Sequence, residues 1–358
     1  MEEEAMIRIR DLERSWREFR IEDINLAIDR GEYFVILGPT GAGKTLLLEL
    51  IAGFYLPDGG EIWIDGVNVT DLAPEERGVG FVYQDYALFP HLTVKENIEF
   101  GLRVKKLPEP EIRRSVSEMM ELLGIEDLKD RYPDTLSGGE RQKTAIARAL
   151  ILKPDLLLMD EPFSALDLRT KQRMQDELKK IHRESGVTMV HVTHDQTEAM
   201  VMADRIGVMM EGRIVQVGGV REVFNKPLNE RIAEFLGVEN VLEGVISEVD
   251  DGLSIIDIGG IEISAVTDLE VGSRVNAFLR PEEITISKVS QKTSARNNIE
   301  AKIEKIVNLG AVVRIELDSG LVALTSRRSA EELGLERGVE VYASFKATAV
   351  HVVRRGSK

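Results

Sequence analysis

The segment GPTGAGKT, residues 38–45, contains the residue types that a phosphate-binding loop requires. It matches the pattern G-x-x-x-x-G-K-[ST] in full and lies between the apolar segments YFVIL and LLLELIAG. A strand that leads through a glycine-rich loop into a helix presents bare backbone N–H groups to an anion. We therefore expect this loop to bind a nucleoside triphosphate. Its expected binding residues are Gly38, Pro39, Thr40, Gly41, Ala42, Gly43, Lys44, Thr45 and Leu46.

Charged and hydroxyl side chains that suit phosphoryl transfer occur at the loop and in a second segment, LLLMDEP, residues 156–162. Lys44 is expected to reach the β- and γ-phosphates, and the Thr45 hydroxyl is expected to bind Mg²⁺. Asp160 follows a run of apolar residues that is typical of a buried parallel strand, and we expect it to hold Mg²⁺ through water. Glu161 is the candidate general base that orients the attacking water.

Two further polar side chains follow predicted strands. His194, in VTHDQ, is expected to hydrogen-bond the γ-phosphate or the attacking water, and Gln84, in FVYQDY, is expected to contact Mg²⁺ or that water. A lone histidine more often has a structural role, which is our interpretation of His191. Glu161, His194 and Gln84 are therefore the candidate catalytic residues, and Thr45, Gln84 and Asp160 are the candidate Mg²⁺ ligands.

The segment LSGGE, residues 136–140, raises the question of why two glycines occur at the start of a helix. Ser137 and Glu140 have the spacing of a capping box, which explains these two residues. Gly138 and Gly139 instead cost helix stability, but they leave backbone N–H groups open to an anion. The pattern indicates a second anion-contacting site.

Alternating strands and helices indicate an α/β domain with a largely parallel sheet. We expect strands at MIRIRDL, EYFVILG, EIWIDG, VGFVYQ, LLLMD and TMVHVTHD, helices near residues 94–103, 109–124, 137–152, 167–185 and 195–203, and a hairpin at RIGVMMEGRIVQVG. After about residue 240 the chain consists of short strands with glycine turns. VGSRVNAFLRPEEITI, residues 271–286, resembles RGVEVYASFKATAVHV, residues 337–352, at an offset of 66, and VLEGVISEV, residues 241–249, resembles IEAKIEKIV, residues 299–307. Two such copies, about 241–290 and 293–358, predict small barrels of the oligonucleotide-binding (OB) type.

In their order, GPTGAGKT, Gln84, LSGGE, LLLMDEP, SALD (164–167) and His194 resemble the ATPase subunit of an ATP-binding-cassette (ABC) transporter. The resemblance implies a P-loop NTPase fold for residues 1–240, with a helical subdomain at about 90–152, and a β-rich regulatory domain at 241–358. ATP and Mg²⁺ are the implied cofactors. Trp16 stands where this family places an aromatic residue that stacks on adenine.

The resemblance also answers the question of the two glycines, because family members close as head-to-tail dimers. Ser137, Gly138 and Gly139 would then contact the γ-phosphate of ATP bound to a second copy, and Asp167 would lie at the dimer seam. The commonest family signature has Gln at the position of Glu140. As half of a capping box, this carboxylate should point at its own backbone and do little harm.

The implied partners are two integral membrane permease subunits and, indirectly, an external substrate-binding protein, which would place the chain at the cytoplasmic face of the cell membrane. The segment 86–102, with apolar Leu88, Phe89, Leu92 and Val94, is either part of the helical core or a groove for a permease helix. The start MEEEAMIRIR is not expected to be a secretory signal. No cysteine is present, and the net charge of −16 argues against a nucleic-acid partner.

The C-terminal segments TSARNN (293–298) and KAT (346–348) resemble molybdate-binding Mop-type modules, also described as TOBE domains. This resemblance implies oxyanion binding by Ser294, Arg296, Lys346 and Thr348, import of molybdate or tungstate, and feedback inhibition by the internal oxyanion. Two alternatives stay open. One is an importer ATPase for sulfate, a polyamine, iron or a sugar, and the other is a soluble ABC ATPase acting on DNA or ribosomes.

Overall fold

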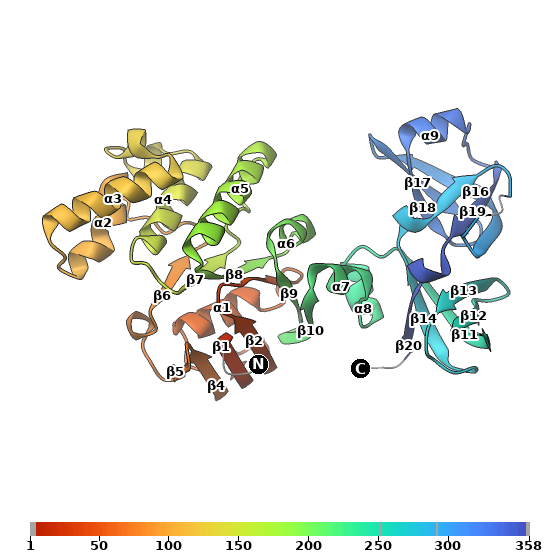
Figure 1. Cartoon of the computed structure of the whole chain (residues 1–358), viewed down its shortest axis with the longest axis horizontal. Helices are drawn as coiled ribbons and strands as arrows, with labels where there is room; N and C mark the ends of the chain where they lie inside the picture. The colour runs from red at the N-terminus through yellow and green to blue at the C-terminus, as the bar shows by residue number, and fades with distance from the viewer. Residues whose placement is uncertain (1–4, 251, 291–292, 356–358) are drawn as a thin grey trace. The chain divides into compact units, whose positions relative to one another are not determined.

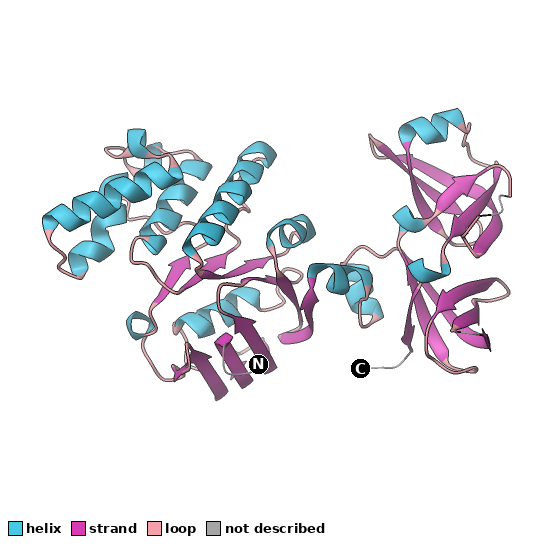
Figure 2. Cartoon of the chain, viewed as in Figure 1, coloured by secondary structure: helices cyan, strands magenta, loops and turns pink. Residues whose placement is uncertain are grey.

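The computed structural model describes residues 5–250, 252–290 and 293–355 of the 358-residue chain. It separates into two compact units, which divide after Val223. Helices dominate the first unit and strands dominate the second (Figure 2). We expected the second domain to begin at residue 241, whereas the second compact unit also contains α8 (Glu230–Phe235), which packs on its first strand, β11.

The first unit contains two sheets (Figure 1). An antiparallel sheet has the order β2-β1-β4-β5, and a six-stranded sheet has the order β10-β9-β3-β8-β7-β6, in which only β10 is antiparallel to its neighbour. The strands are β1 (Ala5–Ser15), β2 (Arg20–Asp29), β3 (Tyr33–Leu37), β4 (Gly59–Ile64), β5 (Val67–Asn68), β6 (Val79–Val82), β7 (Leu156–Asp160), β8 (Thr188–Thr193), β9 (Arg205–Met210) and β10 (Arg213–Gly219). Strand β2 was missed in the sequence, although its alternating burial is typical of a half-buried strand.

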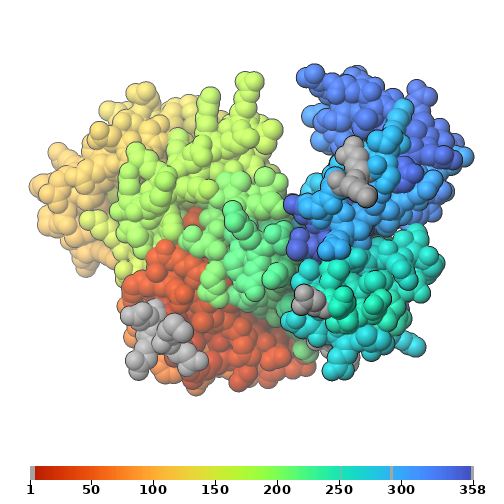
Figure 3. Space-filling model, turned by 45° about the vertical axis from the view of Figure 1, so that its right-hand side comes forward, coloured from red at the N-terminus to blue at the C-terminus, as the bar shows by residue number. Residues whose placement is uncertain are grey.

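The helices of the first unit are α1 (Lys44–Ala52), α2 (Val94–Val104), α3 (Glu109–Leu123), α4 (Gly138–Leu150), α5 (Leu168–Ser185) and α6 (Gln196–Met202), with short 3₁₀ turns η1 (Pro74–Glu76), η2 (Glu126–Leu128) and η3 (Pro133–Thr135). Helices α2 to α6 agree with the predicted ranges to within a few residues. Helix α7 (Val220–Asn225), which spans the division between the units, was missed in the sequence. Helices α2, α3 and α4 pack against one another. In the space-filling view the yellow residues of α2 and α3 gather at one end of this unit (Figure 3).

The core of the first unit positions the phosphate-binding loop. Every residue of β3, β7 and β8 is buried, as expected of parallel strands covered on both faces. Helix α1 starts directly after the loop that follows β3, and it buries Leu47, Leu48, Leu50 and Ile51 in the core shared by both sheets. The carboxyl ends of β3, β7 and β8 therefore meet at one edge, where the predicted catalytic residues follow the strands.

The second unit consists of two antiparallel sheets with the orders β13-β12-β11-β14-β20 and β15-β19-β16-β17-β18. Its elements are β11 (Asn240–Asp250), β12 (Leu253–Asp257), β13 (Glu262–Val266), β14 (Arg274–Leu279), η4 (Pro281–Glu283), β15 (Thr285–Ser287), β16 (Asn297–Asn308), β17 (Val312–Leu317), β18 (Val322–Ser326), α9 (Arg327–Glu332), β19 (Glu340–Phe345), η5 (Ala347–Ala349) and β20 (His351–Arg354). Two curled antiparallel sheets confirm the predicted OB-like fold class.

The two repeats exchange their last strands. Strand β15 of the first repeat pairs with β19 of the second, and β20 of the second pairs with β14 of the first. One hydrophobic core contains buried residues from both repeats. The predicted side-by-side barrels are therefore interlocked, because each sheet needs a strand from the other repeat to be complete.

The structure corrects one of the two sequence alignments of the repeats. Asn240 pairs with Leu279, and Asn297 pairs with Phe345, so β11 and β16 correspond at an offset of 57 residues. Our alignment of 241–249 with 299–307 was wrong by one residue. A shift of one residue moves every side chain to the other face of a strand, and both strands carry enough apolar residues to tolerate either register in the sequence.

Candidate nucleotide-binding site

The phosphate-binding loop is fixed by close backbone contacts. Gly43 has φ +100°, a left-handed conformation that favours glycine, and a Cβ atom at this position would lie 2.7 Å from the ring of Phe19. A Cβ atom on Gly38 would lie 2.2 Å from the carbonyl oxygen of Met209. Both glycines are therefore required by packing, independently of any ligand.

Lys44 is the first residue of α1, and its side chain folds back over the loop. The Nζ atom donates hydrogen bonds to the carbonyl oxygens of Gly38 and Pro39, both at 2.9 Å. Burial lowers the pKa of Lys44, while the nearby carboxylates of Glu161 and Asp160 act in the opposite direction. An ammonium group held only by carbonyl oxygens is well placed to exchange these contacts for phosphate oxygens.

Thr45 and Asp160 form the candidate metal site. The Thr45 hydroxyl donates to Asp160 Oδ1 at 2.9 Å, and burial raises the pKa of Asp160, although the hydrogen bond from Thr45 partly opposes this shift. A hydroxyl, a carboxylate and the carboxamide of Gln84 are oxygen ligands of the kind that Mg²⁺ prefers. No cluster of three His, Cys, Asp or Glu side chains occurs in the described ranges. This small donor set fits Mg²⁺, which is usually held by one or two carboxylates together with phosphates and water.

Glu161 and His194 contact each other directly. Glu161 Oε1 lies 3.0 Å from His194 Nδ1, and the glutamate side chain is 17% exposed whereas the histidine is 52% exposed. Glu161 also has φ +40°, which is uncommon for a residue with a side chain. Its backbone N–H donates to Val192 at 3.0 Å, so the segment is held against strand β8. The pair has the geometry of a carboxylate base and its orienting partner.

A cavity of about 580 Å³ brings most of the predicted residues together. Its lining consists of Phe19, Thr40, Gly41, Gly43, Lys44, Thr45, Leu46, Gln84, Glu161 and His194. Asp160 does not line this cavity; it lines a second one together with Tyr83, Asp85, Ser164 and Ala165, and Gln84 lines both. The sequence reasoning missed Phe19, whose only signal is an aromatic residue close to Trp16 in a segment preceding the loop.

Trp16 is not among the residues that line this cavity. Its ring meets Tyr55 edge-on at 5.8 Å, and the guanidinium of Arg14 lies 5.3 Å from both ring centroids. In this arrangement Phe19, rather than Trp16, is the aromatic side chain beside the phosphate-binding loop.

The LSGGE segment forms the start of α4 as predicted. Glu140 Oε2 accepts from the Ser137 backbone N–H at 2.7 Å and from the Ser137 hydroxyl at 2.9 Å. The backbone hydrogen bond from Ser137 lowers the pKa of Glu140, so this carboxylate points at its own backbone, as we expected. A Cβ atom on Gly139 would lie 2.7 Å from the Thr170 methyl group, so close packing by itself favours glycine here. Gly138 has no such close contact.

The remaining expected nucleotide contact, Asp167, caps α5. Its carboxylate accepts from the backbone N–H groups of Arg169 and Thr170, and from the Thr170 hydroxyl at 2.6 Å. The hydrogen bonds from Thr170 lower the pKa of Asp167. Ser137, Gly138, Gly139 and Asp167 lie outside the cavity that holds Lys44.

The segment 86–102, which includes most of α2, serves partly as core. Val94 is buried, and the fully buried Asn97 accepts from the Phe89 backbone N–H at 2.8 Å and donates to the carbonyl oxygens of Phe89 and Leu92. Phe89 itself packs on the exposed Phe100, with ring centroids 4.5 Å apart. Val94 and Asn97 therefore fit a helical core, whereas Phe89 and the exposed Phe100 fit a groove for a permease helix.

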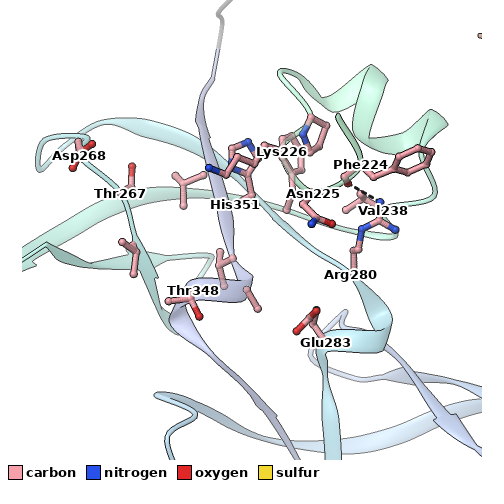
Figure 4. A pocket seen from close by; sticks show the side chains of 16 residues that line it. Phe224, Asn225, Lys226, Val238, Thr267, Asp268, Arg280, Glu283, Thr348 and His351 are labelled. Atoms are coloured by element: carbon pink, nitrogen blue, oxygen red, sulfur yellow. Dashed lines mark hydrogen bonds between the residues drawn. The ribbon is translucent and has the colours of Figure 1, made fainter. Parts of the chain in front are cut away.

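The four candidate oxyanion residues occupy two places in the second unit. Arg296 directly precedes β16 and Lys346 directly follows β19, so both flank the terminal pair Asn297–Phe345 and are neighbours across that ladder. Ser294 precedes β16 and is exposed. Thr348 lines a separate cavity of about 570 Å³ together with Arg280, Glu283 and His351 (Figure 4). The other three candidates do not line that cavity.

Comparison with known proteins gives two family matches. A model described as ABC transporter matches residues 21–164, and a model described as TOBE domain matches residues 293–352. Solved structures agree with the first match. The chain is 32% identical to cbiO1 from Clostridium perfringens, part of an ABC transporter complex, with a TM-score of 0.58 over 62% of this chain and 91% of that chain. A dimeric ATP-binding cassette in a post-hydrolysis state bound to ADP and Pi is 34% identical, with a TM-score of 0.55 over 60% and 99%.

Curated relatives match along almost the whole chain. A molybdate/tungstate import ATP-binding protein of Pyrococcus horikoshii is 48% identical over 97% of this chain and 99% of its own length. The protein of the same description from Thermococcus kodakarensis is 46% identical over 84% and 88%. A spermidine/putrescine import ATP-binding protein of Mannheimia succiniciproducens is 39% identical over 95% and 93%.

Proposed function

The chain belongs to the family of ATP-binding proteins of ABC transporters, and on this premise we propose that it hydrolyses ATP to drive import of molybdate or tungstate. The observation that carries the choice of solute is the 48% identity to a molybdate/tungstate import protein over 97% of the chain, which includes the second unit. Polyamine import proteins match the same length at 39% identity. The solute preference therefore rests on the closer match.

We assign the roles within the site from its contacts. Lys44 and the backbone N–H groups of the loop bind the β- and γ-phosphates, while Thr45, Gln84 and Asp160 hold Mg²⁺. When bound, Mg²⁺ neutralises charge that develops on the phosphate oxygens. Glu161 takes the proton of the attacking water, and His194, 3.0 Å away, orients this carboxylate and contacts the γ-phosphate.

The second half of the site is proposed to come from another copy of the chain. Ser137, Gly138, Gly139 and Asp167 do not line the cavity around Lys44, yet the N–H groups at the start of α4 suit a phosphate. A head-to-tail homodimer would bring them to the ATP of the partner. The similar cassette that was solved as a dimer with ADP and Pi supports this arrangement.

We propose that the dimer works beneath two integral membrane permease subunits at the cytoplasmic face of the membrane, with an external substrate-binding protein supplying the solute. None of the helices in the described part of the chain combines the length and the hydropathy needed to cross a bilayer. The import function of the relatives supports the permease partners.

The second unit is the proposed oxyanion sensor. Its two repeats differ at the positions that are expected to bind the oxyanion. Arg296 and Lys346 are exposed neighbours, and neither forms an ion pair with a described residue. Two such cations suit a tetrahedral dianion, because a hydrogen bond between charged groups is stronger than one between neutral groups. Ser294 is the candidate hydroxyl near this end, and Thr348 follows Lys346 in η5.

The equivalent end of the first repeat is less suited to an anion. The positions of Arg296 and Lys346 are taken there by Glu239 and Arg280. Glu239 pairs with Arg314 at 2.6 Å, and Arg280 Nη2 donates to the Phe224 carbonyl oxygen at 2.7 Å. The position of Thr348 is taken by Glu282, which would repel a dianion. We therefore place the oxyanion site at the second repeat.

Calorimetric titration of the full chain with molybdate, tungstate and sulfate tests this assignment. Binding of molybdate and tungstate but not sulfate is expected. Arg296→Ala should abolish binding, whereas Arg280→Ala and the surface control Arg328→Ala should retain it. Loss of binding in both Arg280→Ala and Arg296→Ala would contradict the distinction between repeats, and binding of spermidine instead would favour a polyamine importer.

Feedback by the oxyanion is a separate part of the proposal. With the membrane subunits reconstituted, added molybdate should lower ATPase activity, and Arg296→Ala should remove this response while leaving basal turnover intact. If wild-type turnover does not change with molybdate, feedback is excluded, but the import function is not. If molybdate lowers turnover by opposing dimer closure, linkage requires that ATP-driven closure lower oxyanion affinity in turn.

A further inference from the structure

A lysine outside the nucleotide cavity joins two segments that carry site residues. Lys171 lies in the first turn of α5, and its side chain is 17% exposed. Its Nζ atom forms ion pairs with Asp195 Oδ2 and with Glu198 Oε1, both at 2.6 Å. Asp195 is the N-cap of α6 and Glu198 lies in its first turn, so one ammonium group ties the starts of both helices together.

The Glu198 end of this contact is anchored in the sheet. Glu198 is 3% exposed and accepts from the Thr193 hydroxyl at 2.6 Å, while His191 Nε2 lies 3.3 Å away. Burial by itself would raise the pKa of Glu198, but the nearby His191, Lys171 and Thr193 side chains hold it below its usual value. The carboxylate is therefore charged and fixed, and Lys171 is fixed with it.

The two joined segments lead directly to the proposed catalytic pair. Asp195 is the next residue after His194, which contacts Glu161 at 3.0 Å. On the other side, the Lys171 backbone N–H donates to the carbonyl oxygen of Asp167 at 2.8 Å. The chain between Glu161 and Asp167 is a tight turn, because the Ser164 N–H and hydroxyl both donate to the Glu161 carbonyl oxygen, at 3.2 and 2.9 Å.

These contacts form a closed ring. From Glu161 the ring follows the turn to Asp167 and the start of α5 to Lys171. The ion pair of Lys171 with Asp195 leads to His194, which contacts Glu161. The contact from Lys171 to Asp195 and Glu198 is the side-chain link between the α5 half and the α6 half of this ring. We propose that Lys171 is a positioning residue, which couples the 164–167 turn to His194 and so aligns His194 with Glu161 for hydrolysis.

This inference rests on the proposed roles of Glu161 and His194. Because the 164–167 turn is also the segment expected at the dimer seam, Lys171 would transmit the position of that turn to the catalytic pair. A small displacement of a catalytic group is sufficient to slow a reaction by a large factor. Lys171 does not line the cavity around Lys44, and its ion pairs are with Asp195 and Glu198, so its loss should spare nucleotide binding.

The test compares Lys171→Met and Lys171→Arg in the full chain by steady-state ATPase kinetics. Lys171→Met should lower kcat by about 10- to 100-fold, with KM for ATP changed by no more than about twofold. Lys171→Arg keeps the charge and should restore most of the activity. Since Lys171→Met leaves the buried Glu198 without its cation, the double variant Lys171→Met/Glu198→Gln, which removes both charges, is measured as well and should also be slow.

A second lysine provides a matched control. Lys143 on α4 is 20% exposed, donates to the Leu123 carbonyl oxygen at 2.9 Å, and pairs with Glu177 of α5 at 2.9 Å. It thus resembles Lys171 in exposure and ion pairing, but it contacts α5 beyond Lys171 and does not join α5 to α6. Lys143→Met should lower thermal stability without lowering kcat at a temperature where the variant is folded.

Three results would overturn the inference. They are an unchanged kcat in both Lys171→Met and the double variant, an equal loss of kcat in Lys143→Met, and a loss in Lys171→Met that appears entirely in KM. Glu161→Gln and His194→Ala are measured in parallel. They distinguish a wrong role for Lys171 from wrong catalytic roles for Glu161 and His194. If those two variants hydrolyse ATP normally, the proposed catalytic roles fail first.

Discussion

Asn297 offers a direct test of how the two C-terminal repeats are interlocked. It lies at the start of β16, is 3% exposed, and reaches β13 of the other repeat. Its Oδ1 accepts from the Ser264 N–H at 2.6 Å, and its Nδ2 donates to the Ser264 carbonyl oxygen at 2.9 Å. Asn240, its counterpart in the first repeat, makes the same two-point contact with Val322. We predict that Asn297→Ala weakens the second unit without affecting ATP hydrolysis.

The magnitude follows from the hydrogen bonds that are lost. Each of the two contributes about 1 kcal/mol net, and a buried group left without a partner costs about 1–3 kcal/mol. Ser264 is only half-buried, so water can partly replace the asparagine. The free energy of unfolding should therefore fall by about 2–4 kcal/mol in Asn297→Ala. Asn240→Ala should cost more, because Asn240 also donates to the Leu279 carbonyl oxygen at 3.0 Å.

Urea unfolding followed by two signals separates the units. Both tryptophans, Trp16 and Trp63, belong to the first unit, so their fluorescence reports that unit, whereas far-UV circular dichroism reports both. Asn298→Ala is the matched control, since Asn298 is the next residue but is exposed. Water can replace its hydrogen bonds with Ser290 and Ser344, so its change should cost less than about 1 kcal/mol. The reasoning is refuted if Asn297→Ala shifts the circular-dichroism transition no more than Asn298→Ala does.

Three further predictions concern the first unit. Glu161→Gln should lower kcat by about 10²- to 10⁴-fold while ATP still binds, because the amide cannot accept the proton of water; phosphate release and nucleotide titration measure the two effects, and normal turnover would exclude Glu161 as the base. Arg77→Met should destabilise the first unit by about 3 kcal/mol or more, because the buried Arg77 donates to four backbone carbonyl groups, two of them at the end of α1; tryptophan-monitored unfolding measures this, and an unchanged midpoint would contradict it. Phe19→Ala should weaken ATP binding in calorimetry more than Trp16→Ala does, because Phe19 lines the cavity; the opposite order would restore Trp16 as the stacking residue.

The sequence by itself determined the features that depend on neighbouring residues. The phosphate-binding loop requires glycines at set positions before a helix, and Lys44 follows them directly. The Ser137–Glu140 capping box is closed by groups three residues apart, which explains why it could be predicted and was confirmed. The order of strands and helices likewise follows from local apolar patterns, with the exceptions of β2, the two-residue β5 and the short helices α7, α8 and α9.

Only the tertiary structure decided which distant segments meet. The sequence suggested Trp16 as the aromatic residue at the nucleotide, whereas only the structure shows that Phe19 lies against Gly43 and that Trp16 contacts Arg14 and Tyr55. The contact of Lys171 with Glu198 also joins separate helices, so no motif reveals it.

The exchange of β15 and β20 between the repeats shows the physical reason most clearly. The sequence pattern states that a strand is half-buried and which of its faces is apolar, but not which neighbour completes its hydrogen bonds. Both repeats have similar last strands, so local preferences cannot distinguish pairing within a repeat from pairing between repeats. That choice is made by the packing of the shared core, which forms only when both repeats fold together.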